Sequence, residues 1–93
     1  MYKRQALIIE ALSDGGLSGG LPKIISEELV IEMILGTICL IKENKLSTSE
    51  IKNLVTSPGG TTISALRILE KKSVRSALIE SIVSASNRSK DFR

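Results

Sequence analysis

The chain has 93 residues, a formal net charge of +3, no histidine and a single cysteine. This length predicts one small domain, which buries only about 60–65% of its unfolded surface. The lack of histidine excludes a Ser-His-Asp triad, a Cys-His pair and an ordinary zinc site, so no metal is expected. Hydrophobic residues make up 42% of the sequence and aromatic residues only 2%, so we expect an aliphatic core between helices rather than a sheet.

Charge is spread unevenly along the chain. Residues 1–46 carry five basic and six acidic side chains, whereas residues 47–93 carry eight and four. A basic half is one feature of nucleic-acid-binding proteins, but only Tyr2 and Phe92 are available to stack on bases. We therefore interpret the basic cluster at residues 71–75 as a solvated face and expect no nucleic-acid partner. A small nucleic-acid binder stays open as a weaker alternative.

The first helix is predicted over residues 3–14. Two glycine pairs follow, Gly15-Gly16 and Gly19-Gly20, which we interpret as a turn between helices with Gly15 or Gly16 as the C-cap. The pairs do not match the Gly-x-Gly-x-x-Gly fingerprint of a dinucleotide-binding domain, and no strand-like run precedes them. They do not form a phosphate loop either, because Leu21 follows Gly20 where a lysine should stand.

The second helix is predicted from about Pro22 to about Asn44. Its middle, residues 29–41, is apolar on nearly every face, which is typical of a helix that is buried on all sides. A monomer of this size rarely surrounds a helix completely, so we expect part of this surface to contact another chain. The uncharged stretch after Glu32 ends at Lys42 and is shorter than the roughly 20 apolar residues of a membrane span, so no membrane partner is expected.

Two small residues lie inside this apolar stretch. Gly36 lowers helix stability by about 1 kcal/mol relative to alanine, and we expect the close approach of a neighbouring helix to compensate. Cys39 is expected to be a small buried hydrophobe. A lone cysteine gives no disulfide framework and fits a reducing cytosol.

Three more helices are predicted in the second half of the chain. Ser47 and Glu50 form a capping box that starts a short helix ending before Pro58. A further helix spans residues 61–72, and the last one begins after Ser73, its predicted cap. The last helix has an apolar stripe at helical spacing, made up of Val74, Ala77, Leu78, Ser81, Ile82 and Ala85. No strand is predicted, so the chain is expected to be all-α.

The most informative segment is residues 55–66, which contains a Pro-Gly-Gly turn followed by the start of a helix. Pro58 ends the preceding element, and Gly59 and Gly60 allow the backbone to approach a ligand closely. Thr61 and Thr62 then place two hydroxyl groups in the first helical turn. Free N–H groups and the positive end of the helix dipole suit a small anion such as a carboxylate or phosphate. A plain tight turn with capping threonines is the alternative.

Residues 55–62, Val-Thr-Ser-Pro-Gly-Gly-Thr-Thr, resemble the signature of pyrroline-5-carboxylate reductases. Residues 10–22 resemble the helix and turn that lead to a Gly-Leu-Pro in this family, and residues 74–90 resemble its closing helix. The resemblance covers residues 6–92 and corresponds only to the C-terminal half of such an enzyme. It divides the chain into a non-family leader at residues 1–5 and a dimerisation domain at residues 6–93, with the N-terminal cofactor domain absent.

The resemblance implies an all-α bundle of about five helices that intertwines with a second copy as a homodimer, while the order above a dimer stays open. It implies an oxidoreductase of the cytoplasm that reduces 1-pyrroline-5-carboxylate to L-proline in the last step of proline biosynthesis. The cofactor is NADPH or NADH, bound mainly by the missing domain, so we expect the isolated chain to be inactive. A stand-alone helical dimerisation module without catalysis is the alternative.

The family's substrate-binding residues correspond here to Ser57, Gly59, Gly60, Thr61 and Thr62. The resemblance implies that backbone N–H groups of residues 60–62 hold the substrate carboxylate. It also implies that the Thr62 hydroxyl hydrogen-bonds the ring nitrogen, which makes Thr62 the catalytic candidate. No residue of the chain is expected to bind the cofactor in the family's manner.

Overall fold

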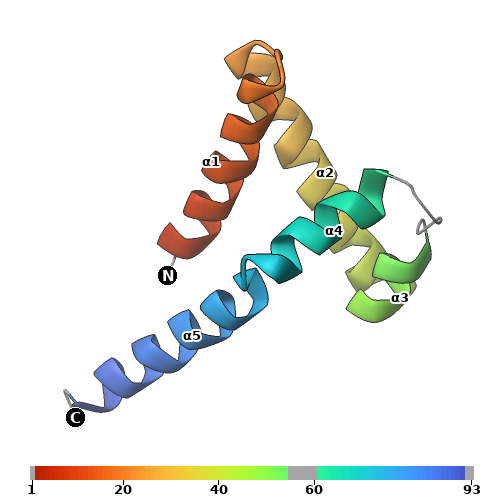
Figure 1. Ribbon diagram of the computed structural model, residues 1–93. Helices are drawn as coiled ribbons and strands as arrows, with labels where there is room; N and C mark the ends of the chain where they lie inside the picture. The colour runs from red at the N-terminus through yellow and green to blue at the C-terminus, as the bar shows by residue number, and fades with distance from the viewer. Residues whose placement is uncertain (1, 55–60, 92–93) are drawn as a thin grey trace. The chain divides into compact units, whose positions relative to one another are not determined.

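In the computed structural model, which describes residues 2–54 and 61–91, the chain forms five α-helices (Figure 1). These helices are α1 (Lys3–Ser18), α2 (Lys23–Asn44), α3 (Thr48–Leu54), α4 (Thr61–Lys71) and α5 (Val74–Asp91). The described residues contain no strand, so the all-α prediction is confirmed. The chain divides into two compact units, residues 1–51 and 52–93.

A glycine-terminated turn joins α1 to α2. The Leu21 N–H donates to the Gly16 carbonyl at 3.1 Å, and the Gly20 N–H donates to the Leu17 carbonyl at 3.0 Å. This pair of bonds, with Gly20 at a φ of 105°, is a Schellman motif in which Gly19 is the C-cap. The prediction that α1 ends at residue 14 with Gly15 or Gly16 as its cap is therefore wrong. The second glycine pair, not the first, provides the left-handed residue that stops the helix.

Helices α1 and α2 pack as a hairpin through a small, polar crossing. The Ser26 hydroxyl, on a residue that is 1% exposed, donates to the Ser13 carbonyl at 2.7 Å. Ser13 is buried as well, and its hydroxyl donates to the Ile9 carbonyl at 2.9 Å. A Cβ on Gly16 would overlap the Ser26 hydroxyl oxygen and would lie 3.2 Å from Ser26 Cβ. Gly16 is thus a helix-packing residue rather than a cap.

The capping box at the start of α3 is confirmed. The Glu50 N–H donates to Ser47 Oγ at 3.1 Å, and the Ser47 N–H donates to Glu50 Oε1 at 3.3 Å. Two N–H groups that a helix of seven residues cannot satisfy internally are satisfied by this exchange. The predicted start of α3 after Ser47 agrees with the observed start at Thr48, whereas Pro58, before which the helix is predicted to end, lies outside the described residues.

In the second unit, α4 and α5 follow one another through a two-residue turn. Ser73 occupies the predicted cap position, because its carbonyl accepts the Ala77 N–H at 3.0 Å. Its backbone is left-handed, with a φ of 61°. Across this junction, Arg75 Nε lies 3.3 Å from Glu70 Oε1, and both side chains are more than half exposed. An exposed ion pair of this kind contributes little to the stability of the junction.

Most of α2 is uncovered in the single chain. Val30 is the one buried hydrophobic residue among the described parts of the chain, at 8% exposure. Cys39 is exposed, so the prediction that it is buried is wrong for this chain on its own. The reason is that α1 covers one side of α2 and leaves the remaining apolar residues open. None of the described helices is long and apolar enough to cross a membrane.

Candidate functional site

The N-terminus of α4 carries the described part of the predicted substrate site. Thr61 and Thr62 are the first two residues of α4, and both are exposed. The first turn contains no acidic side chain, so no carboxylate there offsets the positive end of the helix dipole. The first N–H groups of a helix lack intrahelical acceptors and can bind an anion. Of the other predicted residues, Ser57, Gly59 and Gly60 lie outside the described residues.

A hollow of the second unit lies beside α4, one turn after the threonines. Leu66 lies one turn after Thr62 on the same side of α4, and it is half-buried. It lines a hollow of about 280 Å³ together with residues of α3, α4 and α5. The other residues of this hollow are Lys52, Leu69, Glu70, Val74, Arg75 and Leu78. This hollow therefore begins one helical turn beyond Thr62.

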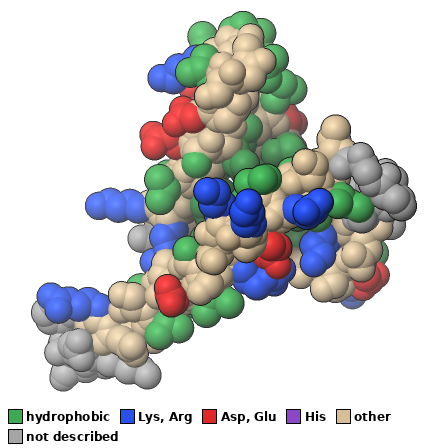
Figure 2. All heavy atoms as spheres, viewed as in Figure 1, with side chains coloured by type: hydrophobic (Ala, Val, Ile, Leu, Met, Phe, Trp, Pro, Cys, Tyr) green, Lys and Arg blue, Asp and Glu red, His purple; other side chains and the backbone are tan. Residues whose placement is uncertain are grey.

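Basic side chains gather on the exposed surface over α4 (Figure 2). Arg67 and Lys71 lie one turn apart and line a second shallow hollow with Ser64 and Ile68. Lys71, Lys72 and Arg75 are all exposed, in agreement with the interpretation of this cluster as a solvated face.

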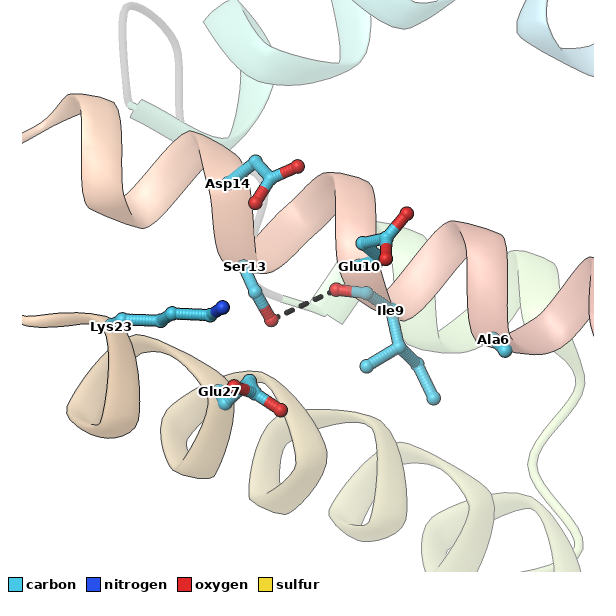
Figure 3. Close-up of a pocket in the computed structure, with 7 residues that line it drawn as sticks. All are labelled: Ala6, Ile9, Glu10, Ser13, Asp14, Lys23 and Glu27. Atoms are coloured by element: carbon cyan, nitrogen blue, oxygen red, sulfur yellow. Dashed lines mark hydrogen bonds between the residues drawn. The ribbon is translucent and has the colours of Figure 1, made fainter.

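A third hollow, of about 420 Å³, lies between α1 and α2 (Figure 3). It is lined by Ala6, Ile9, Glu10, Ser13, Asp14, Lys23 and Glu27. Figure 3 shows the Lys23 side chain extending toward Ser13 and Glu27, whereas Glu10 and Asp14 point away from α2. Among the described residues, no group of three or more His, Cys, Asp or Glu side chains could hold a metal ion. This hollow contains none of the predicted site residues.

The largest candidate contact surface is the uncovered part of α2. Eight large hydrophobic residues of α2 are exposed by 37–71%. These residues are Ile24, Ile25, Leu29, Ile31, Met33, Leu35, Ile38 and Leu40. Extended apolar surface of this kind is rare on soluble monomers and marks an interaction site. The apolar stripe predicted on α5 is also open, since Leu78 and Ile82 are 44% and 56% exposed.

Residues 5–92 match the family model described as pyrroline-5-carboxylate reductase dimerisation. The chain belongs to this family. The resemblance drawn from residues 6–92 is therefore confirmed, as is the helical fold expected from it. The uncovered apolar surfaces of α2 and α5 belong to a domain whose family is defined by dimerisation.

Known pyrroline-5-carboxylate reductases align with almost the whole dimerisation domain. The protein from Synechocystis sp. is 50% identical over 87 residues, which are 94% of this chain and 33% of the relative. The protein from Arabidopsis thaliana is 40% identical over 86 residues, which are 92% of this chain and 31% of that relative. The chain thus spans about a third of the length of the curated relatives it matches.

A solved structure has the same fold. The crystal structure of Plasmodium falciparum pyrroline carboxylate reductase with NADP bound superposes with a TM-score of 0.90 at 32% sequence identity. The match covers 95% of this chain and 34% of that protein.

Sequence reasoning located the start of α4 and both of its threonines, but it missed the crossing of Ser13, Gly16 and Ser26. A signal was present, because these three residues are small and Ser13 and Gly16 are three positions apart on one helix. Gly16 was interpreted as a possible C-cap, because the sequence alone does not show which of the two glycine pairs ends the helix.

Proposed function

We propose that this chain is the dimerisation and substrate-binding part of a pyrroline-5-carboxylate reductase, which reduces 1-pyrroline-5-carboxylate to L-proline with NADPH or NADH. The observation that carries the proposal is the match of residues 5–92 to the dimerisation family, joined to 50% identity with a reductase. Residues 1–5 are proposed as a leader, residues 6–93 as the domain, and the cytoplasm as its location.

The surface of the chain supports a homodimer. Large hydrophobic side chains of α2 are exposed along much of its length. Apolar surface of this extent is rare on soluble monomers and marks an interaction site. Burial of this surface against a second copy fits a family defined by dimerisation.

The start of α4 suits the substrate by its chemistry. The carboxylate of pyrroline-5-carboxylate is a permanent anion, which free N–H groups at a helix N-terminus bind well. In the proposal, the backbone N–H groups of Gly60, Thr61 and Thr62 hold this carboxylate, and Ser57 and Gly59 are further substrate-binding residues. The Thr62 hydroxyl hydrogen-bonds the ring nitrogen and orients the C=N bond. The nicotinamide cofactor supplies the hydride, and its binding falls to a domain other than this one.

A chimaera tests this function. Residues 6–93 replace the matching third of the Synechocystis reductase, whose own cofactor domain is retained. We expect the chimaera to oxidise NADPH or NADH when pyrroline-5-carboxylate is present, and the 93-residue chain alone to show no turnover. A folded, dimeric chimaera that binds cofactor without reducing the substrate would favour the alternative, a dimerisation module without catalysis. Turnover by the isolated chain would contradict the assignment of the cofactor site to another domain.

A further inference from the structure

The two sides of α4 differ in charge. At 3.6 residues per turn, Arg67 and Lys71 lie one turn apart on one side of the helix, and both are exposed. They line a shallow hollow together with Ser64 (Figure 2). Leu66 and Leu69 lie on the other side and line the hollow that α4 shares with α5. Arg67 and Lys71 are called the basic stripe of α4 below.

No acidic side chain compensates the charge of the basic stripe. Glu70 is the one acidic residue of α4, and it is paired with Arg75 at 3.3 Å. Within the described part of the chain, no ion pair involves Arg67 or Lys71. The first turn of α4 contains no acidic side chain. Two positive charges therefore add to the positive end of the helix dipole.

The basic stripe lies within electrostatic reach of the start of α4. At a rise of 1.5 Å per residue, the Cα atom of Arg67 is about 7.5 Å along the helix axis from that of Thr62, and that of Lys71 is about 13.5 Å away. Side chains of a helix lean toward its N-terminus, which favours positions of the two charges nearer to Thr62. Exposed charges interact over about 30 Å at 0.01 M salt and about 8 Å at 0.15 M. The stripe can therefore act on an anion at the start of α4 when the salt concentration is low.

We infer that the basic stripe of Arg67 and Lys71 attracts the substrate carboxylate toward the N-terminus of α4 without touching it. This inference rests on the proposed function and adds two residues to it. A field of one sign raises the local concentration of a substrate of the opposite sign. The carboxylate keeps its charge during hydride transfer, so the stripe stabilises the bound substrate and the transition state equally. It should therefore lower KM and leave kcat unchanged.

A charge series at residue 67 tests the inference in the chimaera described above. The assays use saturating cofactor, about 10 mM salt and a pH above the pKa of the ring nitrogen, where the free substrate carries a net negative charge. Coulomb's law in water gives one charge at about 10 Å an effect of about twofold. Arg67→Gln should therefore raise KM for pyrroline-5-carboxylate about twofold, and Arg67→Glu about fourfold. Arg67→Glu combined with Lys71→Glu should raise it about tenfold.

Matched variants and salt separate charge from structure. Arg67→Lys keeps the charge and should keep KM. Ser64→Gln enlarges a neutral residue of the same hollow and should keep KM as well. In about 1 M salt, where the reach of a charge falls to about 3 Å, the differences in KM among all variants should disappear. A role in folding or packing would not follow the charge or the salt in this way, and circular dichroism checks that each variant stays helical.

The outcomes separate this inference from the proposed function. An Arg67→Glu chimaera with an unchanged KM for pyrroline-5-carboxylate at low salt would overturn the inference and leave the proposed function standing. A change in KM for the cofactor alone would do the same, because the stripe would then act on the phosphate groups of the cofactor. A fall in kcat at constant KM would also overturn it, since Arg67 would then act in the chemical step. A chimaera that binds cofactor without turnover would remove the proposed function and this inference together.

Discussion

Gly15 and Gly16 occupy consecutive positions in α1, yet a methyl group would meet different surroundings at each. At Gly15 it would point into open space, whereas at Gly16 it would meet the buried Ser26 side chain. The same substitution therefore reports helix propensity at one position and helix packing at the other.

Gly16→Ala should destabilise the chain, and Gly15→Ala should stabilise it. Alanine adds about 1 kcal/mol of helix stability at either position. At Gly16 this gain is outweighed by overpacking of about 1–3 kcal/mol and by loss of the Ser26–Ser13 hydrogen bond, about 1 kcal/mol. Urea unfolding at one fixed protein concentration measures both variants. Equal midpoints for the two would contradict the packing role of Gly16.

At the proposed substrate site, Thr62→Val preserves side-chain volume but removes the hydroxyl group. A lost hydrogen bond to a charged group costs about 1.5–3 kcal/mol, so kcat/KM for pyrroline-5-carboxylate in the chimaeric enzyme should fall roughly 10- to 150-fold. Cofactor affinity should not change, since Thr62 is assigned to substrate alone. Thr48→Val, at the start of α3, serves as the matched control. An unchanged kcat/KM would reduce the Pro-Gly-Gly segment to a plain turn.

At the scale of elements, local side-chain signals predicted three of the observed helix starts well. Proline at residue 22, the capping box at residue 47 and the threonines at residue 61 each lie within one residue of an observed helix start. The end of α1 was mispredicted by four residues, because a glycine ends a helix only when its backbone turns left-handed. Composition does not reveal which of four glycines does so. Packing of Gly16 on Ser26 and the φ of Gly20 decide it.

The capping box of α3 is testable at the level of single amides. Ser47→Ala should remove the acceptor of the Glu50 N–H and destabilise the helix start by about 1 kcal/mol. Hydrogen exchange at the Glu50 amide should accelerate about fivefold or more. Ser49→Ala changes the same residue type inside the helix, where no capping bond is lost, and it should leave this rate nearly unchanged. Similar rates in the two variants would show that the box contributes nothing.

At the scale of the whole molecule, the sequence predicted that part of α2 contacts another chain. It did not predict which residues of that surface are exposed in the single chain. The uniform apolarity of residues 29–41 indicated burial by another chain, and α2 is indeed largely uncovered here. The burial of Cys39 was mispredicted for this chain alone. An apolar stretch of sequence does not show whether its residues are covered within one chain or only by another chain. Fewer than half of the predicted site residues, Thr61 and Thr62, lie within the described residues.

Association should make the stability of the chain depend on its concentration. If the dimer is the folded form, each increase in protein concentration shifts unfolding to higher temperature by mass action. We therefore expect the melting temperature to rise steadily between about 1 and 100 μM, a range that brackets micromolar association. Calorimetry measures the shift, and sedimentation at the same concentrations gives the mass. A cooperative transition at a constant temperature, with a monomer mass, would contradict the dimer.

The crossing of α1 and α2 has a consequence for how this domain can change over evolution. The hairpin is closed by serine and glycine, whereas the exposed leucines, isoleucines and methionine of α2 take no part in that closure. Substitutions at these exposed positions can therefore alter how tightly copies assemble while the hairpin keeps its geometry. Substitutions at the crossing act on the hairpin itself. Assembly strength and hairpin geometry are separable traits in this chain.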